Sequence, residues 1–356
     1  MARLGDVCTV SSSNAPISDN RIWLLNLDMV EQQTGNIISY NYVGNDDLNG
    51  SIIQFNTDNV LYSKLRPNLN KVVIPDRGGF STSEMLPLKP NASVLCREYL
   101  AAYLRSDSFV SWAVSKTAGA KMPRLGTKVL LDKEIPLPSL EEQRRIAATL
   151  DKVSDLIAKR REQLDKLDEL VKSRFVEMFG DNYTNPRNLP ILKWDDVFIT
   201  KTGKLDSNAA VVDGKYPFFT CAKEVLSIDT YAFDQEALLL AGNNAAGKYD
   251  VKYYEGRFNA YQRTYVLSLK GNWSYKLFKF QLEEKLDYLQ QQSLGGLTKY
   301  LTLKILGELS FLLPPMEDQK IFDEFAAQID KTKLTIQQSL DKLEVLKKAL
   351  MQQYFG

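Results

Sequence analysis

Residues 237–250 (ALLLAGNNAAGKYD) carry the spacing that most resembles a catalytic motif. An apolar run leads into Gly242, Gly247 and Lys248, which are spaced as in a Walker A phosphate loop. Such a loop also needs a Ser or Thr hydroxyl for magnesium and a following helix whose N-terminus faces the phosphate. Here Tyr249 occupies the hydroxyl position, and the residues after it alternate as a strand does. A nucleotide site is therefore the weakest interpretation, and a β-turn or a ligand-facing loop is preferred.

The composition of the 356-residue chain removes several other chemistries. It contains no histidine, which excludes histidine-based triads, HExxH zinc sites and Cys2His2 fingers. Its three cysteines, Cys8, Cys96 and Cys221, are too far apart for a CxxC site and fit a reducing compartment. Basic and acidic residues number 45 and 44, so bulk charge neither proposes nor excludes nucleic acid. With no signal peptide or apolar run of about 20 residues, we expect a cytoplasmic protein.

The chain contains an internal repeat. With a shift of 176 positions, LPSLEEQ at residues 137–143 falls on LPPMEDQ at residues 313–319. The same shift places LDKLDELVK at 164–172 on LDKLEVLKK at 340–348. The match weakens upstream, where GGFS at 78–81 resembles GRFN at 256–259. Repeats of this length indicate duplicated structural units.

Both repeated segments have the heptad spacing of long coiled-coil helices. About 40 residues at about 1.5 Å each give rods near 60 Å long. Ser139 and Glu142 form an S-x-x-E capping box, and Gly180 stands where a C-terminal cap is expected. The apolar heptad positions of each helix form a seam that is expected to pack against the other helix. The seam residues are Leu150, Val153, Ile157, Leu164 and Leu167 in the first helix and Ile329, Ile336, Leu340, Leu343 and Leu350 in the second.

The remaining segments are expected to be globular and of mixed structure. Strands are predicted at 21–29, 36–43, 58–63 and 70–74, and helices at 98–116 and 273–292. We predict an α+β fold, with α/β-type globular domains, in which two similar domains are joined by a pair of long antiparallel coiled-coil helices related by pseudo-two-fold symmetry. The predicted boundaries are 1–136 and 181–312 for the domains, and 137–180 and 313–356 for the helices.

These features together resemble the specificity (S) subunits of type I restriction–modification systems. The resemblance covers the whole chain and rests on the paired helix starts PLPSLEEQ and LLPPMEDQ. It also rests on YSKLRPNLNKVV at 62–73 and GNNAAGKYDVKYYEGRFNAYQ at 242–262. Each piece alone is weak evidence, whereas their duplication in this order is specific.

The resemblance implies a non-enzymatic subunit that recognises double-stranded DNA. Each target-recognition domain would read one half of a split, asymmetric site, and the helices would set the spacer and dock two modification subunits. Those adenine methyltransferase subunits would carry S-adenosylmethionine, and a motor–nuclease restriction subunit can join them in such systems. The absence of an NPPY-type tetrapeptide and a glycine-rich S-adenosylmethionine loop from this sequence agrees with that division. The alternatives are the specificity partner of another methyltransferase–nuclease arrangement and a coiled-coil scaffold that does not bind DNA.

The candidate DNA-binding residues are polar and basic side chains in the loops, because Asn and Gln pair with adenine and Arg and Lys with guanine or phosphate. An ordinary solvated surface is the competing interpretation for each. The first domain contributes Lys64, Arg66, Asn68, Asn70, Lys71, Lys116 and Lys121, and the second contributes Lys201, Lys204, Asn243, Asn244, Lys248, Asn259, Gln262, Arg263 and Lys299. No catalytic residue and no metal ligand is proposed.

Four residues at the helix starts have two possible roles. Glu141, Gln143, Glu317 and Gln319 either cap the long helices or contact the modification subunits. The sequence does not separate these roles.

Overall fold

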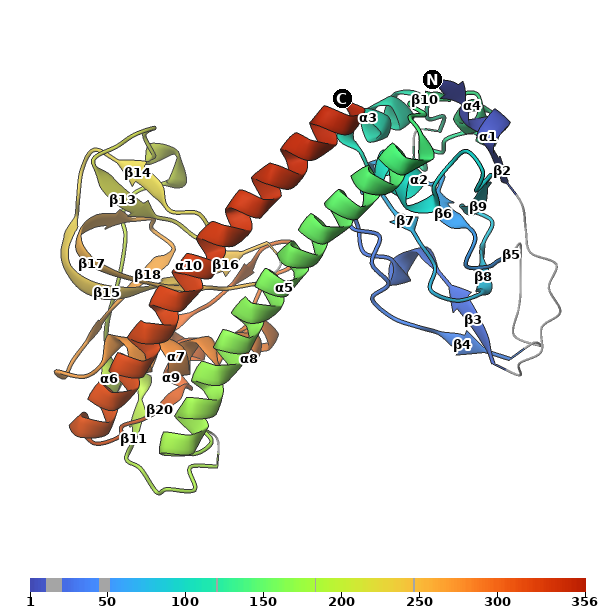
Figure 1. Ribbon diagram of the computed structural model, residues 1–356. Coiled ribbons are helices and arrows are strands. Elements are labelled where there is room, and N and C mark those ends of the chain that lie inside the picture. The colour runs from blue at the N-terminus through green and yellow to red at the C-terminus, as the bar shows by residue number, and fades with distance from the viewer. Residues whose placement is uncertain (11–20, 45–51, 120, 183, 246) are drawn as a thin grey trace. The chain divides into compact units, whose positions relative to one another are not determined.

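The computed structural model describes residues 1–10, 21–44, 52–119, 121–182, 184–245 and 247–356 (Figure 1). The chain divides into two compact units. Unit 1 comprises residues 1–162 and 337–356, and unit 2 comprises residues 163–336. Each unit therefore holds one globular part and about half of each long helix, α5 (Leu140–Phe179) and α10 (Met316–Phe355). In the described part of the chain, no helix is long and apolar enough to cross a membrane.

Two four-stranded sheets form the globular part of unit 1. Their strand orders are β2-β9-β6-β7 and β4-β3-β8-β5, and β1 pairs separately with β10, which lies just before α5 in sequence. The strands are β1 (Ala2–Arg3), β2 (Cys8–Val10), β3 (Ile22–Leu25), β4 (Tyr42–Val43), β5 (Ile52–Phe55), β6 (Val60–Ser63), β7 (Val72–Val73), β8 (Gly79–Thr82), β9 (Met85–Pro90) and β10 (Glu134–Ile135). The short helices are α1 (Leu4–Val7), α2 (Arg97–Leu104), α3 (Asp107–Ser115) and α4 (Thr127–Leu131).

One six-stranded sheet dominates unit 2, with the order β12-β18-β15-β17-β13-β14. The strands are β11 (Ile191–Lys193), β12 (Phe198–Thr202), β13 (Tyr216–Phe219), β14 (Leu226–Ile228), β15 (Phe233–Ala241), β16 (Asn243–Asn244), β17 (Val251–Ala260), β18 (Thr264–Leu269), β19 (Lys299–Tyr300) and β20 (Ser310–Leu312). The short helices are α6 (Trp194–Val197), α7 (Tyr275–Glu283), α8 (Leu286–Gln292) and α9 (Leu303–Gly307).

The two globular parts share one strand topology. The order β2-β9-β6-β7 in unit 1 matches β12-β18-β15-β17 in unit 2, strand for strand in sequence. The parallel pairing of β3 with β8 matches the parallel pairing of β13 with the end of β17. The two sheets are separate in unit 1. In unit 2 the long strands β15 and β17 belong to both corresponding sets of strands and join them into one six-stranded sheet. This correspondence confirms the internal repeat and the mixed α+β fold.

Several predicted elements have different bounds in the structure. The predicted helix over 98–116 is two helices, α2 and α3, because Ser106 caps α3 by accepting a hydrogen bond from the Phe109 amide at 3.2 Å. The predicted helix over 273–292 is likewise divided into α7 and α8. Of the predicted strand 36–43, only Tyr42–Val43 forms a strand, and residues 27–29 form a 3₁₀ turn.

Within each unit, α5 and α10 run antiparallel. In unit 1, Ile146 near the start of α5 shares a core with Phe355 at the end of α10, and Arg161 pairs with Glu344 at 2.8 Å. In unit 2, Phe175 near the end of α5 packs on Phe322 near the start of α10. Each pair of helix halves is thus anchored on the core of its own globular part.

The seam positions of both helices are turned inward. Leu150, Val153, Ile157, Ile329 and Leu340 are buried, and the other five seam residues are half-buried. Apolar residues off the seam, such as Leu170, Leu334 and Val345, are 46%, 61% and 70% exposed. The seam positions are thus more buried than these off-seam positions, and the packing of one seam on the other stays a prediction.

Candidate nucleic-acid interface

Two loops meet in each unit, and most of the candidate residues lie on them. The loop after β6 or β15, here called the sheet loop, covers residues 64–71 in unit 1 and 242–250 in unit 2. The loop after α3 or α8, here called the helix loop, covers residues 116–126 and 293–302. Ala246 of the second sheet loop lies outside the described residues.

Backbone hydrogen bonds tie the two loops of unit 1 together. The Leu125 amide donates to the Lys64 carbonyl at 2.9 Å. Within the helix loop, Ala118 and Arg124 exchange two bonds of 3.0 and 2.9 Å. The helix loop therefore closes on itself and is fixed against the sheet loop.

Unit 2 repeats these bonds at equivalent positions. The Leu301 amide donates to the Gly242 carbonyl at 2.8 Å, and Leu294 and Tyr300 exchange bonds of 3.0 and 2.8 Å. Each of these residues lies 176 or 178 positions after its unit 1 counterpart. The two units therefore present different side chains on the same backbone frame.

The glycines of the second sheet loop serve the turn. A side chain at Gly242 would place its Cβ 2.3 Å from the Arg263 carbonyl oxygen, so this position requires close backbone approach. Gly247 has a φ of +68°, which favours glycine. Strand β17 follows, and Tyr249 is buried, so the loop offers no helix N-terminus to a phosphate. Of the two glycines, only Gly247 has the positive φ expected from the sequence.

Five of the seven candidates in unit 1 reach the surface. They are Lys64, which is half-buried, and the exposed Arg66, Asn68, Lys116 and Lys121. Among the described residues, no carboxylate lies at ion-pair distance from the three lysines or the arginine of this set. These side chains are available to a ligand on the paired loops.

The other two unit 1 candidates are used within the fold. Asn70 is 6% exposed, and its amide donates to the Gln33 side chain at 3.2 Å and to the Arg105 carbonyl at 3.0 Å. The Lys71 ammonium donates to the Leu27 carbonyl, and burial lowers the pKa of Lys71. Both side chains hold the base of the sheet loop, so the structure favours a positioning role for them.

In unit 2 the turn between β17 and β18 joins the candidate surface. The Gln262 amide donates to the Leu205 carbonyl at 2.9 Å, and the Arg263 carbonyl accepts from the Gly242 amide at 2.8 Å. These bonds connect the segment after β12, the turn and the sheet loop. The exposed candidates there are Lys201, Lys204, Lys248, Gln262 and Arg263, and the half-buried ones are Asn243, Asn244 and Lys299.

Asn259 does not belong to this surface. It is 4% exposed, its amide nitrogen donates to the Thr230 carbonyl at 3.4 Å, and its amide oxygen accepts from the Ala260 backbone at 3.0 Å. Conversely, the sequence reasoning missed Arg124, which is exposed on the first helix loop and pairs with Glu84 at 3.0 Å. At the 176 shift Arg124 corresponds to Tyr300, which was not a candidate, so the repeat gave no signal for it.

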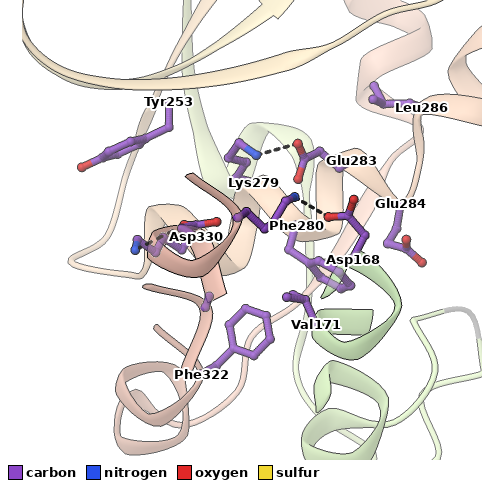
Figure 2. Close-up of a pocket in the computed structure, with 13 residues that line it drawn as sticks. Asp168, Val171, Tyr253, Lys279, Phe280, Glu283, Glu284, Leu286, Phe322 and Asp330 are labelled. Carbon is purple, nitrogen blue, oxygen red and sulfur yellow. Dashed lines mark hydrogen bonds and ion pairs between the residues drawn. The ribbon is translucent and has the colours of Figure 1, made fainter. Parts of the chain in front are cut away.

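A pocket of about 500 Å³ in unit 2 lies among α5, α7 and α10 (Figure 2). Phe280, Phe322 and Val171 supply its apolar wall, and most of its charged side chains pair with one another. Lys279 pairs with Glu283, whose pKa burial raises, and the other pairs are Lys333 with Asp168 and Lys276 with Asp330. The pocket is thus the charged junction between a globular part and the helix pair. In the described part of the chain, no cluster of metal-ligating side chains is present.

The residues at the helix starts separate into two kinds. Gln143 is fully buried and bonds the Cys96 amide at 2.8 Å. Gln319 is 1% exposed and bonds the Ser274 amide at 3.0 Å in the same way. These two glutamines join the helix starts to the globular parts, which leaves no surface on them for a partner, whereas Glu141 and Glu317 are exposed.

Comparison with known proteins identifies similar chains. The family described as "Type I restriction modification DNA specificity domain" matches residues 1–168 and 186–345. The Type I restriction enzyme EcoDI specificity subunit of Escherichia coli is 37% identical over 157 residues, 42% of this chain and 34% of that subunit. The MjaVIII specificity subunit of Methanocaldococcus jannaschii is 30% identical over 102 residues, 28% of this chain and 23% of that subunit. The matches thus span about a third or less of these curated relatives.

Solved structures share the fold. The crystal structure of a type I restriction–modification S subunit from M. genitalium superposes with a TM-score of 0.66 at 14% identity, covering 100% of this chain and 95% of that chain. A chain from a structure described as the basis of complex assembly and conformational transition of the type I R-M system superposes with a TM-score of 0.50 at 19% identity, covering 99% and 96%.

Proposed function

This chain belongs to the family of type I restriction–modification DNA specificity domains, and from this premise we propose that it is the DNA-specificity subunit of such a complex. In this role it catalyses no reaction itself. The globular part of each unit reads one half of a bipartite, asymmetric DNA site, and the helix pair sets the spacer between the halves.

The observation that carries this proposal is the shared backbone frame of the paired loops. Equivalent bonds, from Leu125 to Lys64 and from Leu301 to Gly242, hold the loops in both units. The side chains on that frame differ, with Arg66 in unit 1 where Asn244 stands in unit 2. A duplicated frame with different polar groups suits the reading of two different half-sites, because base identity is read by donor and acceptor patterns.

The charge distribution supports binding to the DNA backbone. The whole chain has a net charge of only +1, yet the candidate loops concentrate cations that have no carboxylate at ion-pair distance among the described residues. Lys116 and Lys121 in unit 1 and Lys248 in unit 2 are exposed examples. Lysines of this kind release counterions from phosphates, so the affinity should fall steeply with salt.

Catalysis is assigned to partners. The exposed helix surfaces, including Glu141 and Glu317, are proposed to dock two modification subunits that bind S-adenosylmethionine and methylate adenine. A motor–nuclease subunit can join the proposed complex, which acts in the cytoplasm.

The test is binding and methylation by the chain purified with its modification subunits. Duplexes of 40 base pairs would carry either the motif methylated in the host genome or the same bases shuffled. The proposal predicts selective binding and methylation of the motif duplex. Equal binding and methylation of both duplexes would refute it, and no DNA binding by the intact complex would favour a scaffold.

A further inference from the structure

Arg66 has an unusual backbone for an exposed residue. Its φ of +49° and ψ of +66° lie in the left-handed region, which side chains other than glycine, asparagine and aspartate rarely adopt. Arginine has no short side-chain group that stabilises this conformation locally. Such strain persists only where the surroundings impose it, and it concentrates at functional sites.

Contacts on both sides of Arg66 impose the conformation. Its amide donates to the Pro123 carbonyl of the helix loop at 2.8 Å, and its carbonyl accepts from the Leu69 amide at 2.9 Å. Pro67 is buried immediately after it. The backbone of Arg66 is therefore fixed between the two loops.

Among the described residues, the side chain of Arg66 makes no hydrogen bond or ion pair that offsets this strain. It is exposed, and no carboxylate among the described residues lies at ion-pair distance. The equivalent residue of unit 2, Asn244, closes its own turn instead, because its side-chain oxygen accepts from the Lys248 amide at 3.2 Å. Position 66 thus orients a guanidinium towards solvent from a rigid, strained backbone.

We propose that Arg66 reads a guanine in the half-site recognised by unit 1, an inference that rests on the proposed function. The guanidinium fork can donate two parallel hydrogen bonds to the O6 and N7 atoms of guanine in the major groove. A phosphate contact needs no fixed backbone, and flexible lysines such as Lys116 and Lys121 supply it. Bidentate hydrogen bonding to a base does need the backbone that carries the side chain to be held in place, and the strained backbone of Arg66 is held in this way.

The experiment selects bound sequences from a pool of duplexes randomised over 25 base pairs. The full chain with its modification subunits is used as wild type, Arg66→Lys, Arg66→Ala and Arg66→Gly. Sequencing of the bound pool gives the base preference at each position, and melting of the full chain is measured in parallel. Asp213→Gly is the control, because Asp213 is also exposed with a positive φ of +57° but lies outside the paired loops.

The proposal predicts a loss at one position of one half-site. All three Arg66 variants should lose preference for one guanine by about fivefold to a hundredfold, while the other half-site stays unchanged. Arg66→Gly should melt above Arg66→Ala, the reverse of the order at ordinary positions, because glycine relieves the strain. Asp213→Gly should leave all base preferences unchanged.

Three results overturn the inference, and they are separable from failure of the proposed function. A uniform affinity loss without a change in any preference would make Arg66 a phosphate contact. Unchanged base preferences would show that Arg66 takes no part in recognition. An Arg66→Ala variant that melts above Arg66→Gly would show that the backbone of Arg66 is not strained. If the wild-type complex itself selected no motif, the proposed function would fail instead.

Discussion

Replacing Gln143 with alanine tests how the long helices are joined to the globular parts. The Gln143 side chain is fully buried, accepts from the Cys96 amide at 2.8 Å, and donates to the Val94 and Pro138 carbonyls at 2.9 Å each. The substitution removes all three bonds at once. It also leaves three buried backbone groups, the amide of Cys96 and the carbonyls of Val94 and Pro138, without this hydrogen-bond partner.

The expected cost follows from those bonds. A neutral hydrogen bond contributes about 1 kcal/mol net, and a buried group left unsatisfied costs about 1 to 3 kcal/mol. Allowing for partial relaxation, we expect Gln143→Ala to lower the free energy of unfolding of unit 1 by about 3 kcal/mol. The equivalent Gln319→Ala should cost somewhat less in unit 2, because its side chain makes two such bonds, to the Ser274 amide and the Pro314 carbonyl.

Urea unfolding of the full chain, followed by circular dichroism, measures the loss. Hydrogen exchange localises it, because Gln143→Ala should speed exchange in α2 and the first turns of α5 but not in α7. Glu141→Ala is the matched control, since Glu141 is exposed two residues earlier on the same helix and should change the stability by less than about 0.5 kcal/mol. If Gln143→Ala were as stable as Glu141→Ala, Gln143 would not hold the start of α5 on the globular part of unit 1.

Three further predictions address the turn, a buried charge and the helix pair. Gly242→Ala should destabilise unit 2 by about 1 to 3 kcal/mol, seen as a lower melting temperature, because its Cβ would lie 2.3 Å from the Arg263 carbonyl oxygen. Burial lowers the pKa of Lys285 from 10.5 to about 8, so Lys285→Met should stabilise the chain below pH 8 by on the order of 2 kcal/mol. Between pH 8 and 10.5 the unfolded chain binds more protons than the folded one, so that advantage should shrink as the pH rises, as urea titrations would show. Inserting one heptad after residue 162 of α5 and another after residue 336 of α10 keeps the seam and lengthens the helix pair by about 10 Å. The spacer in the methylated motif should then lengthen by about three base pairs. An unchanged spacer would show that the helix pair does not set the spacer length.

The sequence was most informative where structure follows from local periodicity. Heptad spacing identified both long helices, and the 176-residue shift identified the duplication that the strand orders confirm. The division of the predicted helix at Ser106 was missed, because apolar residues continue across it and only the cap reveals the break. Periodicity within a helix carries little information about where a new helix begins.

The candidate surface was less predictable, because burial of a polar residue depends on distant partners. Asn70 and Asn259 look like surface amides in the sequence, yet each is held by residues about 30 positions away. Gly242 looks like a glycine chosen for positive φ, whereas its neighbour across the turn leaves no room for a side chain. The strain at Arg66 leaves no trace in the sequence, since its causes lie in a loop almost 60 residues further on.

The methylome of the host, read by single-molecule sequencing with the gene intact and deleted, tests whether this chain directs methylation to a bipartite site. Two half-site readers joined by a helix pair predict a motif of two defined blocks separated by a fixed number of undefined base pairs. That motif should be methylated in the intact strain and unmethylated in the deletion strain. A methylation pattern that is the same in both strains would show that this chain does not select the methylated sites.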